Sequence, residues 1–194
     1  MSSESDLIDG QLTNEFSIIF NLSRKWAEKV NQAREQLPPS PIRIDRPHMT
    51  LIRAVSSPNF RADEELVSAV KSYAFSLLNQ KLTVTLEAID NHPDIKLFGL
   101  TGVAMLKVPQ LILDVRKSLI SSLEKQGYFI ETSVKNSFIP HVTLNIGVAI
   151  SKGQQETIEK ILPKGSILNF DSWSLLRDIL KDGKRLALEV PGSN

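Results

Sequence analysis

Pro47-His48-Met49-Thr50-Leu51 is the most informative segment of this sequence, because the same pattern returns as Pro140-His141-Val142-Thr143-Leu144. Side chains alternate between the two faces of a β-strand, so the histidine and threonine of each copy point to one face and the apolar residues to the other. The apolar residues would anchor each strand in a core. Two such strands brought together would place two imidazoles and two hydroxyls in one site.

Histidine is scarce in this chain, and its distribution strengthens the argument. Of the 3 histidines, His48 and His141 have threonine two positions later, and His92 does not. A single histidine on a strand is most often structural, but a duplicated His-x-Thr pattern with matching proline and leucine is typical of a site. His92 belongs to the turn-like stretch Asn91-His92-Pro93-Asp94, and we interpret it as a surface loop residue.

Composition restricts the kind of protein. A length of 194 residues suits one domain, or one domain built from two similar lobes. With 23 Lys and Arg against 22 Asp and Glu, the net charge is +1, which argues against a general basic surface for long nucleic acids but leaves small anionic ligands open. Cysteine is absent, which excludes disulfides and thiolate metal sites and favours an intracellular protein. Residues 1–14 predict a loose leader without a secretion signal, and no apolar run is long enough to cross a membrane.

Hydrophobic periodicity predicts a similar order of elements in each half of the chain. The first half predicts a strand at 15–22, a helix at 23–36, the motif strand at 42–55, a helix at 62–78 and a strand at 81–89. The second half predicts a strand at 95–103, a helix at 109–127, a short strand at 128–132, the motif strand at 138–150, a helix at 151–162 and strands at 167–176 and 186–190. This order predicts an α/β (α+β) fold of two lobes, with helices outside the sheets and a groove between the lobes.

Two finer expectations concern individual elements. In the strand at 81–89, Leu82, Val84 and Leu86 should share one buried face. In the helix at 109–127, which Gly127 should close, the residues available for the buried face are Leu111, Leu113, Val115, Leu119, Ile120 and Leu123.

Two imidazoles and two hydroxyls suit acid–base chemistry on a phosphate. Imidazole titrates near neutral pH, so one histidine can activate water while the other protonates the departing alkoxide. The threonine hydroxyls can donate to the non-bridging oxygens, and a nearby cation would offset developing charge. The scheme needs no metal or other cofactor, and either histidine can take either role. A two-histidine metal site is the weaker interpretation, because no carboxylate or cysteine lies near the motifs to complete the coordination.

With both motifs in view, the sequence resembles the two-histidine (2H) phosphoesterase superfamily, which includes 2′–5′ RNA ligase-like proteins and cyclic nucleotide phosphodiesterases. The resemblance covers nearly the whole chain and extends to Phe170-x-x-Trp173-x-Leu175-Leu176 near its end. It implies one bilobal domain over residues 1–194, with pseudo-twofold symmetry, duplicated sheets and a central groove holding both motifs.

The same resemblance implies that His48 and His141 are catalytic and that Thr50 and Thr143 hold the phosphate. Bacterial ligase-like members often carry arginine shortly after the second motif. This chain instead has Asn145-Ile146 there and an arginine, Arg53, after its first motif.

Further candidates for substrate binding are basic, polar or aromatic residues near the motifs. The arginines and the lysine are candidates for phosphate contacts, against solvated surface charge as the alternative. The asparagine would share the face of His141 if its strand continues regularly. The aromatic residues could stack on a nucleobase, although such residues more often belong to a core. The candidates are Arg46, Arg53, Phe98, Lys135, Phe138, Asn145 and Trp173.

We therefore expect a metal-independent phosphoesterase that hydrolyses 2′,3′-cyclic phosphate or 2′–5′ phosphodiester bonds in nucleotides or RNA ends. The alternative is an RNA- or nucleotide-binding module that uses the same groove without significant turnover. Intact imidazoles in both motifs favour the enzyme. We expect a monomer in the cytoplasm, or the nucleus if the source is eukaryotic, with no membrane partner.

Overall fold

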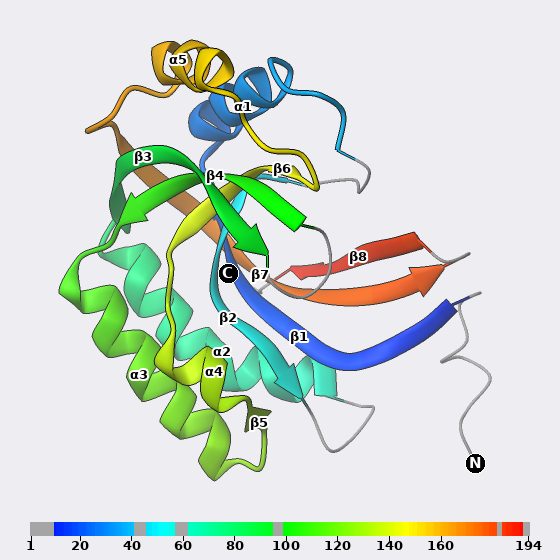
Figure 1. Ribbon diagram of the computed structural model, residues 1–194. Coiled ribbons are helices and arrows are strands. Elements are labelled where there is room, and N and C mark those ends of the chain that lie inside the picture. The colour runs from blue at the N-terminus through cyan, green and yellow to red at the C-terminus, as the bar shows by residue number, and fades with distance from the viewer. Residues whose placement is uncertain (1–9, 41–45, 57–61, 95–98, 182–183, 192–194) are drawn as a thin grey trace.

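The strands and helices alternate in the order that the periodicity predicts (Figure 1). The computed structural model describes residues 10–40, 46–56, 62–94, 99–181 and 184–191. Its elements are β1 (Gly10–Leu22), α1 (Arg24–Arg34), β2 (His48–Ser56), α2 (Ala62–Asn79), β3 (Thr83–Asp94), β4 (Gly99–Lys107), α3 (Gln110–Lys125), β5 (Phe129–Ile130), α4 (Thr132–Asn136), β6 (His141–Ile146), α5 (Lys152–Ile161), β7 (Ile167–Lys181) and β8 (Lys184–Pro191).

The strands form an antiparallel sheet whose pairings close on themselves. Along the circuit β1 pairs with β2, β2 with β6, β6 with β4, β4 with β3, β3 with β7, and β7 again with β1. β8 extends this sheet from β7, and the short β5 pairs with β2. The two motif strands, β2 and β6, are therefore direct neighbours.

The two halves of the chain repeat one topology. The order β1-α1-β2-α2-β3 returns as β4-α3-β6-α5-β7, with β5 and α4 inserted before β6. Equivalent strands occupy equivalent places in the circuit, so the pairing of β2 with β6 lies on the local twofold axis. The helices cover the sheet in pairs: α1 packs with α5, and α2 packs with α3 on the other side of the strands (Figure 1). The expected bilobal α+β architecture with outer helices is confirmed.

A continuous apolar core explains why these segments pack as they do. Leu82, Val84 and Leu86 are all buried, as the alternation in this strand predicts. Trp26 and Val30 of α1 belong to the same core and fix that helix against the strands. None of the helices in the described ranges combines the length and apolar character needed to cross a membrane.

Several predicted boundaries are wrong. Pairing with neighbouring strands decides where most of these strands begin and end, and the local sequence does not reveal it. β1 begins at Gly10, which pairs with Lys181, so residues 10–14 are not part of a leader. β3 continues through Asp94, so the stretch from Asn91 to Asp94 is strand and not turn. The motif strands are shorter than expected, and a helical turn, α4, forms in the polar segment before β6.

The buried face of α3 differs in part from the expected one: Leu119, Ile120 and Leu123 are buried as predicted, but the first turns are not arranged as predicted. Leu111 and Leu113 are exposed, while the buried residues of the helix are Ile112, Arg116, Leu119, Ile120 and Leu123. The helical period therefore places an arginine in the middle of the apolar stripe. Gly127 follows the helix with a φ of 87°, the left-handed conformation that glycine adopts readily, and it closes the helix as predicted.

Candidate functional site

The two motifs meet at the twofold axis. Met49 of β2 is paired with Val142 of β6, and both side chains are fully buried on the core face. Antiparallel geometry aligns His48 with Thr143, and Thr50 with His141, on the opposite face. The two histidines are then diagonal neighbours, with about 7–8 Å between their Cα atoms. An anion of phosphate size lying over the strand pair can therefore face both imidazoles and both hydroxyls.

Each imidazole is held by the backbone two residues before it. The Nδ1 atom of His48 lies 2.9 Å from the carbonyl oxygen of Arg46, and Nδ1 of His141 lies 2.8 Å from that of Ile139. A carbonyl oxygen can only accept, so both Nδ1 atoms carry the proton and donate. In a neutral imidazole this leaves Nε2 as the basic nitrogen, and the ring orientation is the same in both halves.

A bulge follows each His-x-Thr motif at the same position. Across β1 and β2, Thr50 is aligned with Ile19 and Ile52 with Ile18, which leaves Leu51 as an extra residue. Across β4 and β6, Thr143 is aligned with Val103 and Asn145 with Gly102, which leaves Leu144 extra. An extra residue reverses the alternation beyond it. The third residue after each threonine, Arg53 or Ile146, therefore returns to the site face.

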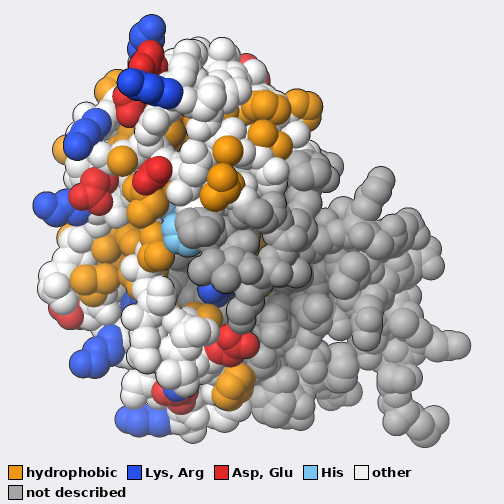
Figure 2. Space-filling model, viewed as in Figure 1, with side chains coloured by type: hydrophobic (Ala, Val, Ile, Leu, Met, Phe, Trp, Pro, Cys, Tyr) orange, Lys and Arg blue, Asp and Glu red, His pale blue; other side chains and the backbone are white. Residues whose placement is uncertain are grey.

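A cavity of about 450 Å³, a volume typical of small-molecule sites, lies beside the motifs. Thr50, His141 and Thr143 line it, whereas His48 is not among its lining residues. The predicted substrate-binding residues Arg53 and Phe138 line it too. In the space-filling view a histidine side chain reaches the surface near the middle of the face, with hydrophobic side chains beside it (Figure 2). Half of the remaining lining residues are apolar: Leu51, Val103, Val134, Ile139 and Ile146.

Two other candidates lie away from the cavity. Asn145 is 1% exposed and is aligned with Gly102, because the bulge turns it to the face opposite Thr143. The expectation that it faces the groove is wrong, since it assumed an uninterrupted strand. Trp173 is 2% exposed within the apolar core, so stacking on a ligand is ruled out for this ring. Phe98 lies outside the described residues.

The side chains of two basic candidates are engaged elsewhere. Lys135 forms a 2.8 Å ion pair with Glu124 of α3 and does not line the cavity. Arg46 forms a 3.2 Å ion pair with Asp171 of β7 and does not line it either. The contribution of Arg46 to the site is its carbonyl oxygen, which orients His48.

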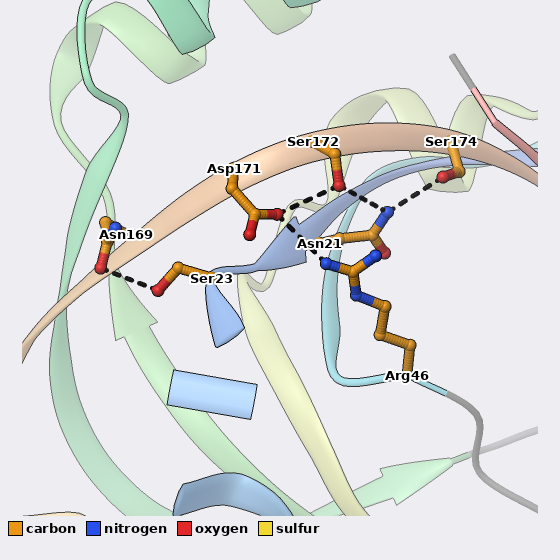
Figure 3. A network of polar contacts seen from close by, with 7 residues as sticks. All are labelled: Asn21, Ser23, Arg46, Asn169, Asp171, Ser172 and Ser174. Atoms are coloured by element: carbon orange, nitrogen blue, oxygen red, sulfur yellow. Dashed lines mark hydrogen bonds and ion pairs between the residues drawn. The ribbon is translucent and has the colours of Figure 1, made fainter. Parts of the chain in front are cut away.

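A polar network joins β1 and β7 beside His48 (Figure 3). Asp171 accepts from Arg46 and from the hydroxyl of Ser172, and the amide of Asn21 donates to the hydroxyls of Ser172 and Ser174. Asn21 is buried and is aligned with His48 across the strand pair. The network therefore fixes both the backbone that precedes His48 and the strand beside it.

Arg116 of α3 is a site residue that the sequence interpretation missed. Its guanidinium lines the cavity, is 7% exposed, and lies 4.8 Å from the centre of the Phe138 ring. Nε donates to the carbonyl of Leu51 at 3.0 Å, and the two terminal nitrogens donate to the carbonyls of Val134 and Lys135. Burial lowers the pKa of Arg116, yet a guanidinium stays protonated in proteins. The cavity therefore has a permanent positive charge in its wall.

The other half contains a counterpart of this arginine. Arg34 of α1 donates to the carbonyl of Thr143 from Nε at 3.3 Å and from a terminal nitrogen at 2.8 Å. Each motif strand is thus held at its bulge by an arginine from a helix that begins in the other half of the chain. Arg34 does not line the cavity, and Arg116 does.

His92 and Thr101 are further residues that the sequence did not reveal as part of the site. They are aligned across β3 and β4, and both line the cavity. The ring of His92 lies nearly parallel to that of His141, at an angle of 11° with 6.1 Å between centres, so its interpretation as a surface loop residue is wrong. Thr101 is 6% exposed, and its hydroxyl has no hydrogen-bond partner within the described part of the chain. His92 and Thr101 reach the cavity because β3 continues through Asn91–Asp94, and no local feature of the sequence predicts that continuation.

By sequence, the chain matches no family model and no curated protein. Its fold, in contrast, is found among solved structures. A phosphoesterase structure is 16% identical, with a TM-score of 0.56 over 92% of this chain and 95% of the other. E. coli LigT complexed with 3′-AMP is 16% identical, with a TM-score of 0.55 over 91% and 95%. The protein TT0787 of Thermus thermophilus is 13% identical, with a TM-score of 0.61 over 91% and 94%.

The chain has the fold of these solved structures, which include a phosphoesterase and LigT. The fold expectation drawn from the duplicated motifs is therefore confirmed, since the match covers nearly the whole chain as well as nearly the whole of each structure. Within the described ranges, no three residues among the histidines, aspartates and glutamates come together as a metal site.

Proposed function

We propose that this protein is a metal-independent phosphoesterase that hydrolyses 2′,3′-cyclic phosphate or 2′–5′ phosphodiester bonds in nucleotides or RNA ends. The observation that carries the proposal is the pairing of the two motifs at Met49 and Val142. It puts two imidazoles with the same tautomer, and two hydroxyls, over one point of the sheet. The fold that the chain shares with a phosphoesterase and the binding of 3′-AMP by its structural neighbour LigT support this proposal.

The proposed reaction needs only these four side chains and water. The Nε2 atom of one histidine takes a proton from water, whose oxygen attacks phosphorus. The bond from phosphorus to the 2′ or 3′ oxygen breaks, and the imidazolium of the other histidine gives its proton to that oxygen. Thr50 and Thr143 donate to the non-bridging oxygens. The histidine that acts as the base gains one proton, and the histidine that acts as the acid loses one. Proton exchange with solvent then restores the starting protonation of both.

The pH dependence of this mechanism follows from the two roles. One imidazole must be neutral to act as the base, and the other must be protonated to act as the acid. The rate should therefore fall on both sides of a maximum near neutral pH. Either histidine can fill either role, because His48 and His141 are oriented in the same way.

The test is a turnover assay with 2′,3′-cyclic mononucleotides, 2′–5′ dinucleotides and RNA that ends in a cyclic phosphate. His48→Asn and His141→Asn are the sharpest variants, because an amide can still donate to the carbonyl that each imidazole contacts. Each should lower turnover by about 10²–10⁴-fold, because each removes a proton-transfer group. Thermal unfolding of the variants checks that the fold is unchanged.

Two results would contradict the proposal. If a histidine variant retains near-normal turnover of every substrate that the parent protein hydrolyses, that histidine is not catalytic. If the parent protein hydrolyses nothing in the panel but binds nucleotides in the cavity, the alternative of a binding module replaces the enzyme. Loss of activity on adding EDTA, with recovery on adding a metal, would also count against a mechanism with two imidazoles.

A further inference from the structure

Arg116 presents an electrostatic problem that the proposed reaction does not solve. Its guanidinium is buried, and its described polar contacts are backbone carbonyls and the face of an aromatic ring. No carboxylate among the described residues forms an ion pair with it. Buried charges in proteins are normally paired with an opposite charge, since carbonyl dipoles reduce the cost of burial without neutralising the charge. An anion in the cavity would supply that neutralisation.

The backbone contacts alone do not explain why this arginine lines the cavity. Arg34 holds the bulge of the other motif strand through similar contacts to the carbonyl of Thr143, and it does so outside the cavity. A guanidinium has five N–H donors, and Arg116 uses three of its nitrogens, one contact each, on carbonyl oxygens. Two of its donors therefore have no partner among the described residues.

Arg53 is a second cation in the cavity lining, and it lies two residues beyond Leu51, whose carbonyl accepts from Arg116. The bulge at Leu51 returns Arg53 to the site face, where its side chain is exposed and forms no ion pair with the described residues. Ser133 and Ser137 also line the cavity; the hydroxyl of Ser133 donates to the carboxylate of Glu131 at 3.1 Å, so Ser137 is the serine considered as a further donor. Arg53 lies three residues beyond Thr50, about 10 Å along a regular strand and somewhat less across a bulge. This part of the cavity is therefore separate from the point where the motifs meet.

We propose that Arg53 and Arg116 form a second anion subsite, which holds a phosphate adjacent to the one being hydrolysed. Two guanidinium groups and a nearby hydroxyl match the shape and charge of a phosphate, which arginine binds through paired N–H donors. The inference rests on the proposed function and narrows its substrate class. The preferred substrate is a nucleotide with a further phosphate on its 5′ side, as in a 5′-phosphorylated nucleotide or an RNA end, and not a nucleoside cyclic monophosphate.

Binding of product nucleotides tests the subsite without relying on turnover. Titration calorimetry would compare adenosine 2′-monophosphate with adenosine 2′,5′-bisphosphate at one fixed salt concentration. The bisphosphate should bind about tenfold or more tightly, because it adds charge-assisted hydrogen bonds to a second phosphate. Arg53→Gln should remove most of that preference. Arg24→Gln, a change on the exposed surface of α1 where Arg24 pairs with Glu28, should leave the preference intact.

Arg116 has a matched control in Arg34. Arg116→Lys retains the charge but loses the planar fork, so it should reduce the preference for the bisphosphate. Arg34→Lys makes the same change at the other bulge and should retain the preference. If the Arg116 variant does not fold, the Arg53 variant still decides the question, because that side chain is exposed.

Equal affinity of the parent protein for both nucleotides would overturn the subsite, and so would a preference that survives in both Arg53→Gln and Arg116→Lys. A third ligand is adenosine 2′-phosphate extended on its 5′ side by one nucleotide. It distinguishes an RNA end from a free 5′-phosphorylated nucleotide as the source of the second phosphate. Tight binding of it supports an RNA end, and tight binding of the bisphosphate alone supports a free nucleotide. Failure of the proposed function would appear instead as an absence of turnover, whatever the binding preference.

Discussion

Replacing Arg116 with methionine should destabilise the fold substantially. The methionine fills much of the same volume but donates no hydrogen bonds. The carbonyls of Leu51, Val134 and Lys135 would each lose a charged donor, and the contact with the Phe138 ring would lose its cation. These carbonyls belong to β2 and α4, so the change loosens the connection between the two halves.

The expected magnitude follows from those contacts. A hydrogen bond to a charged group contributes about 1.5–3 kcal/mol to stability. The loss of three such bonds could therefore lower the free energy of unfolding by well over 5 kcal/mol if nothing offset it. Relief of the cost of burying the guanidinium, and access of water from the cavity, offset part of this loss. We expect a net decrease of about 2–4 kcal/mol in the free energy of unfolding, which places the change among the large single-residue effects.

Urea unfolding of the parent protein and the variant measures this difference, with the m-value checking that both unfold in the same way. Arg34→Met is the matched comparison. Arg34 donates from two nitrogens to the carbonyl of Thr143 and from the third to the side-chain oxygen of Asn31. It is only partly buried, so water can replace much of what its loss removes, and the expected cost is about 1 kcal/mol. The reasoning is refuted if Arg116→Met costs less than 1 kcal/mol or no more than Arg34→Met.

Three further changes test other parts of the site and fold. Thr101→Val should raise the free energy of unfolding by about 1 kcal/mol, because it removes a buried hydroxyl without a partner among the described residues; unchanged or lower stability in thermal unfolding would contradict this. Burial, with a smaller effect of Glu65, raises the pKa of Tyr128 above 10.0, so the folded state binds this proton more tightly than the unfolded state. Stability should therefore decrease as pH rises above about 10, and it should do so less in Tyr128→Phe, as measured by unfolding at a series of alkaline pH values. The double variant at His48 and His141 should lose much less turnover than the product of the two single losses, since the pair acts as a unit; full multiplicativity would argue for independent roles.

The sequence predicted the centre of the site because that part depends on local geometry. Strand alternation places a histidine and a threonine on one face and apolar residues on the other. Met49 and Val142 are buried as this alternation requires. The duplication led us to expect both motif strands at one site, but their direct pairing at Met49 and Val142 was not predicted.

The rest of the lining depends on pairing that no local signal encodes. The bulges at Leu51 and Leu144 exist only relative to β1 and β4, and each reverses the alternation after its motif. That reversal brings Arg53 to the cavity and turns Asn145 to the core face. Simple alternation from Thr50 and Thr143 gives the opposite result for both residues.

Arg116 did leave a signal in the sequence, and it was misread. The positions Ile112, Arg116, Leu119 and Leu123 follow one stripe of a helix, and the stripe is apolar except for the arginine. The expected buried face included Leu111 and Leu113 beside Leu119, Ile120 and Leu123, and it left Arg116 out. A charged residue inside an apolar stripe indicates a buried charge, and a buried charge indicates a partner.

Because the two halves are related by a local twofold axis, the few residues that differ between them can determine how the substrate is oriented. The motifs, their imidazole tautomers, their bulges and the arginines that hold the bulges are repeated in both halves. The third residue after each threonine is not repeated, because it is Arg53 in one half and Ile146 in the other. A symmetric pair of imidazoles cannot by itself determine which one faces the leaving oxygen. Under the proposed mechanism, the unequal charges at the two ends of the cavity must orient the substrate, and its orientation then assigns the roles of acid and base.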